Sequence, residues 1–181
     1  MLTKTIFSGF GGQGVLMMGY IMALSAMRDG MHVTYLPAYG AEVRGGTANC
    51  TVSISDEEIA SPVASFPDYV IVLNKPSLIR YEGQLKSKGT LFLNSDLIDM
   101  DAERKDIEVV RVPANTMAKK LKSERTANMI MLGAFAAATK ITSIDSLMGA
   151  LAEVVKTKSA RQMETNRKGL EMGSQYVLRG V

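Results

Sequence analysis

The chain has 181 residues, which suits one domain with its own hydrophobic core and is short for two. Its 46% hydrophobic and 22% charged residues exclude the disordered class, in which hydrophobic residues are few and net charge is high. The formal net charge of +3 comes from 21 basic and 18 acidic residues mixed along the sequence, so we expect no nucleic-acid partner.

The first part of the chain alternates between strand and helix patterns. Residues 2–8 predict a strand that ends in glycines, and residues 15–27 carry apolar residues at helical spacing. A second short strand follows at 32–36, and Pro37 is expected to break it. Residues 38–46 are rich in glycine and predict a functional loop.

The same alternation continues to about two thirds of the chain, after which only helices are predicted. We therefore expect a single domain over residues 1–181, with a three-layer α/β/α fold, a Rossmann-like and mostly parallel sheet, and a helical C-terminal part. The further strands are predicted at 47–55, 68–73, 89–94 and 108–112, and the further helices at 76–86, at 115–121 and from 126 onward, with the last one at 160–178.

Residues 126–139 are apolar nearly all round the predicted helix. Such a helix must be buried on more than one side, either in the core of this domain or against another subunit. The apolar stretch 129–139 is shorter than the roughly 18 residues needed to cross a bilayer, and no signal-peptide pattern precedes the first glycines. We expect no membrane span and a cytoplasmic protein.

Cys50 is the only cysteine and His32 the only histidine. An iron–sulfur cluster needs several thiolates and a zinc site needs several Cys or His ligands, so this chain cannot build either alone. Cys50 lies in a strand-like run and is expected to be a small buried hydrophobe, and His32 is expected to begin a strand. We predict no catalytic residue and no metal ligand in this chain.

The segment Gly-Phe-Gly-Gly-Gln-Gly at residues 9–14 lies between the first strand and the first helix. Glycines there let backbone N–H groups approach an anionic ligand at the positive end of a helix, although they can also serve only a tight turn with close packing. The dinucleotide version of this motif needs an acid at the end of the second strand. The nearest later acid is Glu42, beyond Pro37, which disfavours a nicotinamide dinucleotide.

The second glycine-rich loop, at residues 38–46, should lie at the same edge of the sheet as the first loop, since both follow parallel strands. Arg44 lies beside glycines of this loop, Gly45 and Gly46, and could present its planar donors to a carboxylate or phosphate without crowding. The alternative is a surface loop in which Glu42 and Arg44 pair with each other.

These residues carry a resemblance to a known family. The chain resembles the gamma subunits of 2-oxoacid:ferredoxin oxidoreductases, which are equivalent to one domain of the single-chain pyruvate enzymes and belong to the pyruvate/ketoisovalerate ferredoxin oxidoreductase gamma domain family. It looks closest to the 2-oxoglutarate type. Ala41 departs from the family, which more often has proline there. The resemblance covers nearly the whole chain and is carried by residues 9–16, 39–40, 42–50, 61–62, 74, 76–78, 128–129, 132–134, 164, 166 and 169.

The resemblance implies an oxidoreductase that converts a 2-oxoacid and coenzyme A into acyl-CoA and carbon dioxide and passes electrons to ferredoxin or a similar acceptor. Thiamine diphosphate, Mg²⁺ and the iron–sulfur clusters would lie on alpha and beta catalytic subunits and a ferredoxin-like delta subunit, and the isolated chain could form a homodimer. Both glycine loops would face the catalytic subunits, where they would help to shape the active site or receive part of coenzyme A, with Arg44 as the best candidate for binding an anionic group. The candidate cofactor-binding residues are Gly9, Gly11, Gly12, Gln13, Gly14, Tyr39, Glu42, Arg44, Gly45, Gly46, Asn49 and Asn128.

Two alternatives stay open at this point. The chain could be a stand-alone dinucleotide-binding oxidoreductase domain, which the missing acid at the second strand argues against. It could also be a purely structural subunit whose loops and apolar helix serve only assembly.

Overall fold

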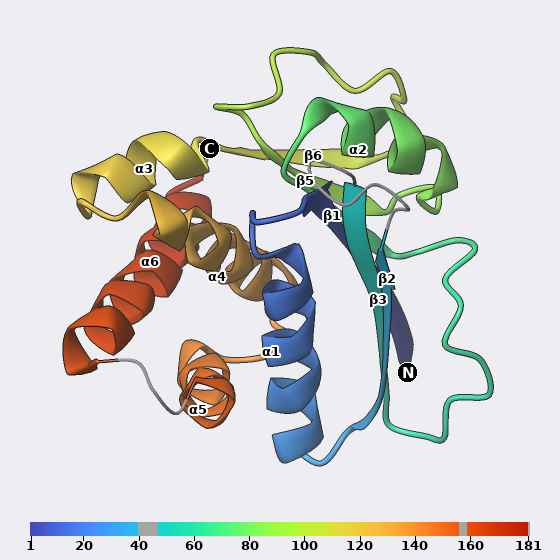
Figure 1. Cartoon of the computed structure of the whole chain (residues 1–181). Coiled ribbons are helices and arrows are strands. Elements are labelled where there is room, and N and C mark those ends of the chain that lie inside the picture. Colours follow the sequence, from blue (N-terminus) through green and yellow to red (C-terminus); the bar gives the residue numbers. More distant parts are fainter. Residues whose placement is uncertain (40–46, 156–158, 181) are drawn as a thin grey trace.

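The structure is a computed structural model and describes residues 1–39, 47–155 and 159–180 (Figure 1). The strands are β1 (Leu2–Phe10), β2 (His32–Tyr39), β3 (Thr47–Ser55), β4 (Tyr69–Val72), β5 (Thr90–Asn94) and β6 (Glu108–Val112). The helices are α1 (Val15–Arg28), α2 (Lys75–Tyr81), α3 (Ala114–Lys120), α4 (Ala127–Thr139), α5 (Ile144–Val154) and α6 (Ala160–Leu178), and the 3₁₀ turns are η1 (Glu82–Gln84) and η2 (Glu124–Thr126).

The strands form one six-stranded sheet in the order β2-β3-β1-β4-β5-β6. β1, β4, β5 and β6 are parallel, whereas β3 pairs antiparallel with both β1 and β2. α2 covers one face, and α1, α4, α5 and α6 lie on the other (Figure 1). The predicted α/β/α fold with a mostly parallel sheet is confirmed.

The larger core lies between the sheet and the helices α1, α4, α5 and α6. At its centre Phe135 of α4 meets Phe7, Tyr69 and Phe92 of three strands edge-on, with ring centroids 6.0, 5.5 and 5.4 Å away. α4 is therefore buried in the core of this domain, one of the two readings that its composition left open. A smaller cluster fills the space between the sheet and α2.

α4 and α6 pack so closely that glycine is required where they cross. A Cβ atom on Gly133 would lie 2.0 Å from the carbonyl oxygen of Leu170. A Cβ atom on Gly173 would lie 1.9 Å from the carbonyl oxygen of Ile130. These are contacts with backbone atoms, so neither helix can make room by changing a rotamer.

Two predicted boundaries are wrong. Pro37 does not break the second strand, because β2 is the outermost strand and continues to Tyr39, and proline is tolerated where its nitrogen faces away from the sheet. The helix predicted at 76–86 ends at Tyr81 and tightens into η1, after which Leu85 is extended.

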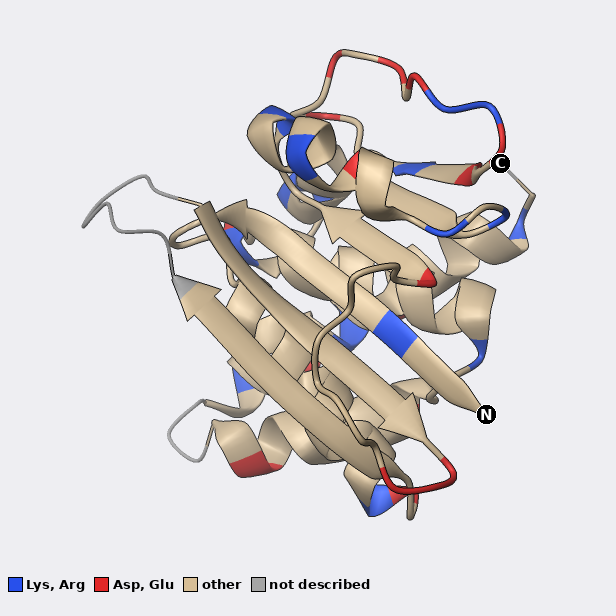
Figure 2. Cartoon of the chain, turned by 90° about the vertical axis from the view of Figure 1, so that its right-hand side faces the viewer, with Lys and Arg blue, Asp and Glu red and all other residues tan. Residues whose placement is uncertain are grey.

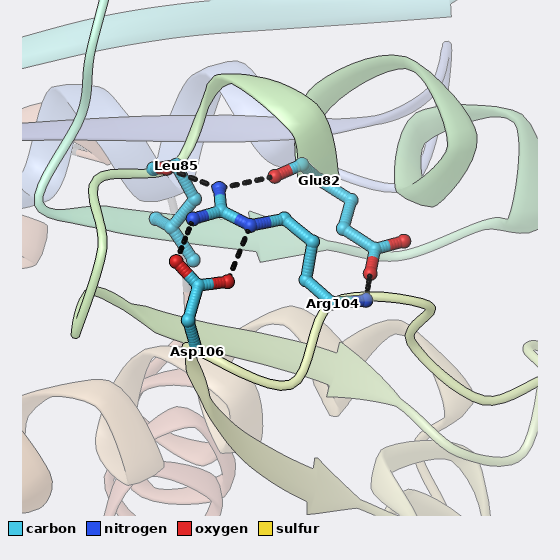
Figure 3. Close-up of polar contacts among 4 residues, drawn as sticks. All are labelled: Glu82, Leu85, Arg104 and Asp106. Carbon is cyan, nitrogen blue, oxygen red and sulfur yellow. Dashed lines mark hydrogen bonds and ion pairs between the residues drawn. The ribbon is translucent and has the colours of Figure 1, made fainter.

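The connection between β5 and β6 is held by Arg104 (Figure 3). Its side chain donates from Nε and Nη2 to the carboxylate of Asp106, over 2.8 and 2.6 Å, and from Nη1 to the carbonyl oxygens of Glu82 and Leu85. The backbone N–H of Arg104 donates to Oε1 of the buried Glu82 over 2.8 Å. Arg104 thereby ties residues 95–107 to the end of α2.

We expect the fold to lose stability in acid through Asp106. The hydrogen bonds from Arg104 lower the pKa of Asp106 from 3.8 to about 2. The contribution of the Arg104–Asp106 pair to the free energy of unfolding is therefore complete above pH 3.8 and is lost as the pH falls through 2. In urea unfolding at a series of pH values, Asp106→Asn should flatten the decline in stability below pH 4, while Glu58→Gln at an exposed position should leave it unchanged. Equal declines for wild type and Asp106→Asn would contradict this assignment.

Candidate functional site

The first glycine segment forms a turn whose geometry is fixed by Gln13. The backbone N–H of Phe10 donates to Gln13 Oε1 over 2.6 Å, and Gln13 Nε2 donates to the carbonyl oxygen of Leu73 at the end of β4 over 3.2 Å. A Cβ on Gly9 would lie 2.6 Å from Gln13 Oε1, so Gly9 is needed for close packing. Gly12 has a φ of +92° with open space around it, as a tight turn requires.

Gly14 precedes α1 and packs against Asn128 at the start of α4. Its φ is +79°, and a Cβ there would lie 2.3 Å from Asn128 Nδ2. Asn128 is 8% exposed and its Oδ1 accepts from the N–H of Met129, whereas its Nδ2 donates to no acceptor among the described residues. The first turns of α1 and α4 thus meet around a buried amide with a free donor.

A crevice of about 930 Å³ opens beside this contact, at the carboxyl ends of β1, β4 and β5. The chain leaves β1 through α1 toward β2 and leaves β4 through α2 toward β5, so the crevice lies where the winding direction of the sheet changes. Ligands of open α/β sheets bind at such points. The lining residues come from three segments, from two strand ends and from two further positions. They are 12–14 with Met17, 121–129, and 161, 162, 165 and 166, then Leu73 and Asn94 at the strand ends, and finally Leu97 and Asn115.

The crevice is suited to a negatively charged ligand. Lys122, Arg125 and Arg161 line it against a single acid, Glu124, and none of the three cations forms an ion pair with a described residue. The N-termini of α1, α4 and α6 also border it, with no acidic residue in their first turns. α1 has no side-chain cap, so N–H groups of its first turn can bind an anion. In α4 the N–H of Ala127 already donates to the carbonyl oxygen of Glu124, and the N–H of Met129 donates to Asn128 Oδ1.

The structure brings four of the predicted site residues together in the crevice wall: Gly12, Gln13, Gly14 and Asn128. Gly9 and Gly11 belong to the strand end and the turn beside it. Asn49 does not join this group, although the resemblance suggested it. It pairs with Ser8, whose side chain faces α2, and cross-strand partners share a face.

The second glycine loop is described only at its start. The ends of β1 and β2 flank the same part of β3, because Phe10 pairs with Thr47 and Tyr39 with Ala48. The two loops therefore begin at the same edge of the sheet, as predicted, although an antiparallel strand separates them. Glu42, Arg44, Gly45 and Gly46 lie outside the described residues, as does the side chain of Tyr39.

The sequence reasoning missed the cations of the crevice. Lys122 and Arg125 follow the predicted helix 115–121 in a polar stretch that reads as a surface turn. Arg161 is about 35 residues farther along and joins them only because α6 packs along α4. The one usable signal was the expectation that ligands bind at the carboxyl ends of parallel strands, which points to Leu73 and Asn94.

Cys50 is a buried hydrophobe, as predicted. Its side chain is fully buried, Sγ donates weakly to the carbonyl oxygen of Val15, and burial raises the pKa of the thiol to about 12. A thiol with such a pKa is neither a nucleophile nor a metal ligand near neutral pH. His32 begins β2, as predicted.

The strand order also argues against a dinucleotide site at the glycine turn. In dinucleotide-binding folds the second strand lies beside the first and its terminal acid binds the ribose. Here antiparallel β3 occupies that position, so the end of β2 is two strands away from the turn.

Among the described residues, no group of three or more His, Cys, Asp or Glu side chains could hold a metal ion, and no helix is long and apolar enough for a membrane span.

The profile of the family described as pyruvate ferredoxin/flavodoxin oxidoreductase matches residues 4–176. The ketoisovalerate oxidoreductase subunit VorA of Methanothermobacter marburgensis is 35% identical over 176 residues, which cover 96% of this chain and 36% of that protein. The 2-oxoglutarate synthase subunit KorC of the same organism is 32% identical over 180 residues, which cover 96% of this chain and 95% of that protein. The chain thus spans about a third of VorA and nearly all of KorC.

Solved structures agree with these relatives. The gamma subunit of a keto/oxoacid ferredoxin oxidoreductase from Geobacter sulfurreducens superposes with a TM-score of 0.82 at 30% identity, over 98% of this chain and 99% of that one. A 2-oxoglutarate:ferredoxin oxidoreductase from Magnetococcus marinus has the same fold, with a TM-score of 0.91 at 22% identity over 99% of this chain and 32% of that one. The chain belongs to the pyruvate ferredoxin/flavodoxin oxidoreductase family, as its two glycine-rich motifs predicted.

Proposed function

We propose that this chain is the gamma subunit of a multisubunit 2-oxoacid:ferredoxin oxidoreductase that acts on 2-oxoglutarate. The reaction breaks the bond between the carboxylate and the oxo carbon, releases carbon dioxide, and joins the remaining acyl group to the coenzyme A thiol as succinyl-CoA. Two electrons pass to ferredoxin or a similar acceptor.

The observation that carries this proposal is the match to KorC along 95% of its length. VorA is slightly more similar, but this chain corresponds to only 36% of it. The match to nearly the whole of KorC supports an assignment to the 2-oxoglutarate type. Pyruvate is the alternative 2-oxoacid, because pyruvate synthase subunit PorC of Methanothermobacter thermautotrophicus is 32% identical over 155 residues.

The residues of this chain do not fit the redox cofactors of such an enzyme. Its single thiol is buried with a raised pKa, whereas an iron–sulfur cluster needs several thiolates. The described residues also hold no cluster of ligands for the Mg²⁺ that accompanies thiamine diphosphate. We therefore place thiamine diphosphate, Mg²⁺ and the clusters on alpha and beta catalytic subunits and a ferredoxin-like delta subunit.

The crevice between α1, α4 and α6 is our candidate site for the phosphate-bearing part of coenzyme A. Lys122, Arg125 and Arg161 can neutralise phosphate oxygens, and the free Nδ2 donor of Asn128 adds a hydrogen bond at a fixed position. The volume of about 930 Å³ is within the range of nucleotide-sized pockets. Glycines 12 and 14 keep side chains out of the entrance.

The test is steady-state kinetics of the purified complex containing Arg125→Ala or Arg161→Ala. Each change removes a charge-assisted contact, so we expect the KM for coenzyme A to rise on the order of tenfold while the KM for 2-oxoglutarate stays unchanged. Arg179→Ala is the matched control, because Arg179 follows the C-terminal end of α6, whereas Arg161 lies in its first turn. A variant that carries both Arg125→Ala and Arg161→Ala provides the decisive result. If it assembled into the complex and kept the wild-type KM for coenzyme A, the crevice would not be the coenzyme A site.

A further inference from the structure

The face of the sheet that α2 covers is left open over the strands β2 and β3. The hydrophobic cluster beneath α2 takes its strand residues from β1, β4 and β5. Figure 2 turns this side toward the viewer: no helix lies in front of β2 and β3, and only the connection 56–68 passes over this part of the sheet. Among the described residues, these two strands therefore have a helical layer on one side only.

The register shows which side chains point to this side. Ser8 of β1 donates to Ser77 of α2 over 2.8 Å, whereas Cys50 of β3 contacts Val15 of α1. Side chains alternate along a strand, and cross-strand partners share a face. The even-numbered residues of β1 and β2 and the odd-numbered residues of β3 therefore point to the α2 side, and we call this surface the open face.

The open face is almost without charge. Its one Lys, Arg, Asp or Glu is Lys4, whose ammonium group already donates to two carbonyl oxygens of the connection 56–68, over 3.3 and 2.5 Å. The large hydrophobic side chains exposed on it are Leu2, Leu36 and Phe10, at 47, 42 and 38%. The centre of a protein interface is depleted in charged residues, so this composition is typical of a surface that another protein covers.

The open face ends at the glycine turn that forms one wall of the crevice. Phe10 is the last residue of β1, and its N–H donates to the side chain of Gln13, which lines the crevice. Thr47 of β3 pairs with Phe10 at the same end of the sheet. A protein seated on the open face therefore reaches the sheet edge at which the crevice opens.

The relatives show that this unit occurs joined to other protein. The region of VorA that matches this chain is 36% of that protein, and the same fold makes up 32% of the Magnetococcus marinus chain. The rest of each of those chains needs a surface of this unit to pack against. The open face is suited to that contact, because it has few charges to desolvate.

We propose that the open face is the surface on which a catalytic subunit of the oxidoreductase docks, with the cross-strand row of Leu36, Thr51 and Ile6 at its centre. The inference rests on the proposed function, in which that subunit transfers an acyl group to coenzyme A held in the crevice. The matching surface of the subunit is uncharged and apolar, since a charge buried there would find no counter-charge among the described residues of the open face.

Cysteine labelling tests the proposal, because the native thiol gives no background. Cys50 is fully buried and its pKa is raised to about 12, so a maleimide should leave the wild-type chain unlabelled. Leu36→Cys should be labelled readily in the isolated chain and about tenfold more slowly in the purified complex with the alpha and beta subunits. Met27→Cys is the matched control: Met27 is 58% exposed on α1, on the other side of the sheet, and should be labelled equally in both.

A charge at the same position gives a second measurement. Leu36→Glu should weaken the binding of this chain to the catalytic subunits on the order of a hundredfold, because it buries an unpaired carboxylate in the interface. Met27→Glu adds the same charge outside the open face and should assemble as the wild type does. Both isolated variants should keep the urea midpoint of the wild type, since both side chains are exposed.

The outcomes separate this proposal from the proposed function. An active complex in which Leu36→Cys is labelled as fast as in the isolated chain, or which Leu36→Glu enters as well as the wild type, would overturn the docking surface alone. Protection of Leu36→Cys in the isolated chain as its concentration rises would assign the open face to a second copy and would also overturn it. A chain that joins no complex with 2-oxoacid oxidoreductase subunits would overturn both.

Discussion

Gly133→Ala is expected to destabilise the chain by about 3 kcal/mol. The new Cβ would lie 2.0 Å from the carbonyl oxygen of Leu170 and 2.7 Å from its Cα, so α4 and α6 would have to move apart along their contact. In an exposed helix the same substitution stabilises by up to about 1 kcal/mol, so the sign of the change separates packing from helix propensity. Urea unfolding of the isolated chain, followed by circular dichroism, measures the difference.

Gly83→Ala provides the comparison for this result. Gly83 lies in η1, and no atom lies within 4 Å of the position that its Cβ would take. We expect its free energy of unfolding to stay within about 0.5 kcal/mol of wild type. A Gly133→Ala chain as stable as Gly83→Ala would mean that α4 and α6 do not approach as closely as described.

Gly14→Ala should raise the KM for coenzyme A in the assembled complex by on the order of tenfold. The substitution forces a residue with a Cβ into a φ of +79° and pushes that Cβ to 2.3 Å from Asn128 Nδ2. The amide must then turn away from the crevice, and the first turns of α1 and α4 separate. Steady-state kinetics with varied coenzyme A, at saturating 2-oxoglutarate, gives the effect.

Gly12→Ala separates backbone strain from the contact with Asn128. Gly12 also has a positive φ, of +92°, but open space lies where its Cβ would go. Its effect on the KM for coenzyme A should therefore be the smaller of the two. Equal effects would show that strain in the turn, and not the position of Asn128, controls the affinity.

The local part of the fold was predictable because it depends on residues close in sequence. The strand, glycine turn and helix at the start follow from periodicity and from glycines at positions of positive φ. Pro37 misled the prediction because proline marks the end of most strands, and only the position of β2 at the edge makes it harmless. The insertion of β3 between β1 and β2 is a long-range pairing that no local pattern reveals.

The candidate site likewise combines residues that nearby sequence predicts with residues that only long-range packing brings into place. Gly12, Gln13 and Gly14 were found from their spacing, and Asn128 only from the family resemblance. Arg161 could not be found either way, since a lone arginine at the start of an amphipathic helix usually faces solvent. Its place in the crevice follows from the crossing of α4 and α6, which depends on Gly133 and Gly173, neither of which lines the crevice.

The walls of the crevice come from residues near positions 12, 94, 125 and 161, almost the full span of the chain. No nascent polypeptide on the ribosome can hold a complete binding site until α6 has emerged and docked. The proposed coenzyme A site is therefore complete only after synthesis and folding are finished, and a chain truncated before α6 would lack one wall of the crevice.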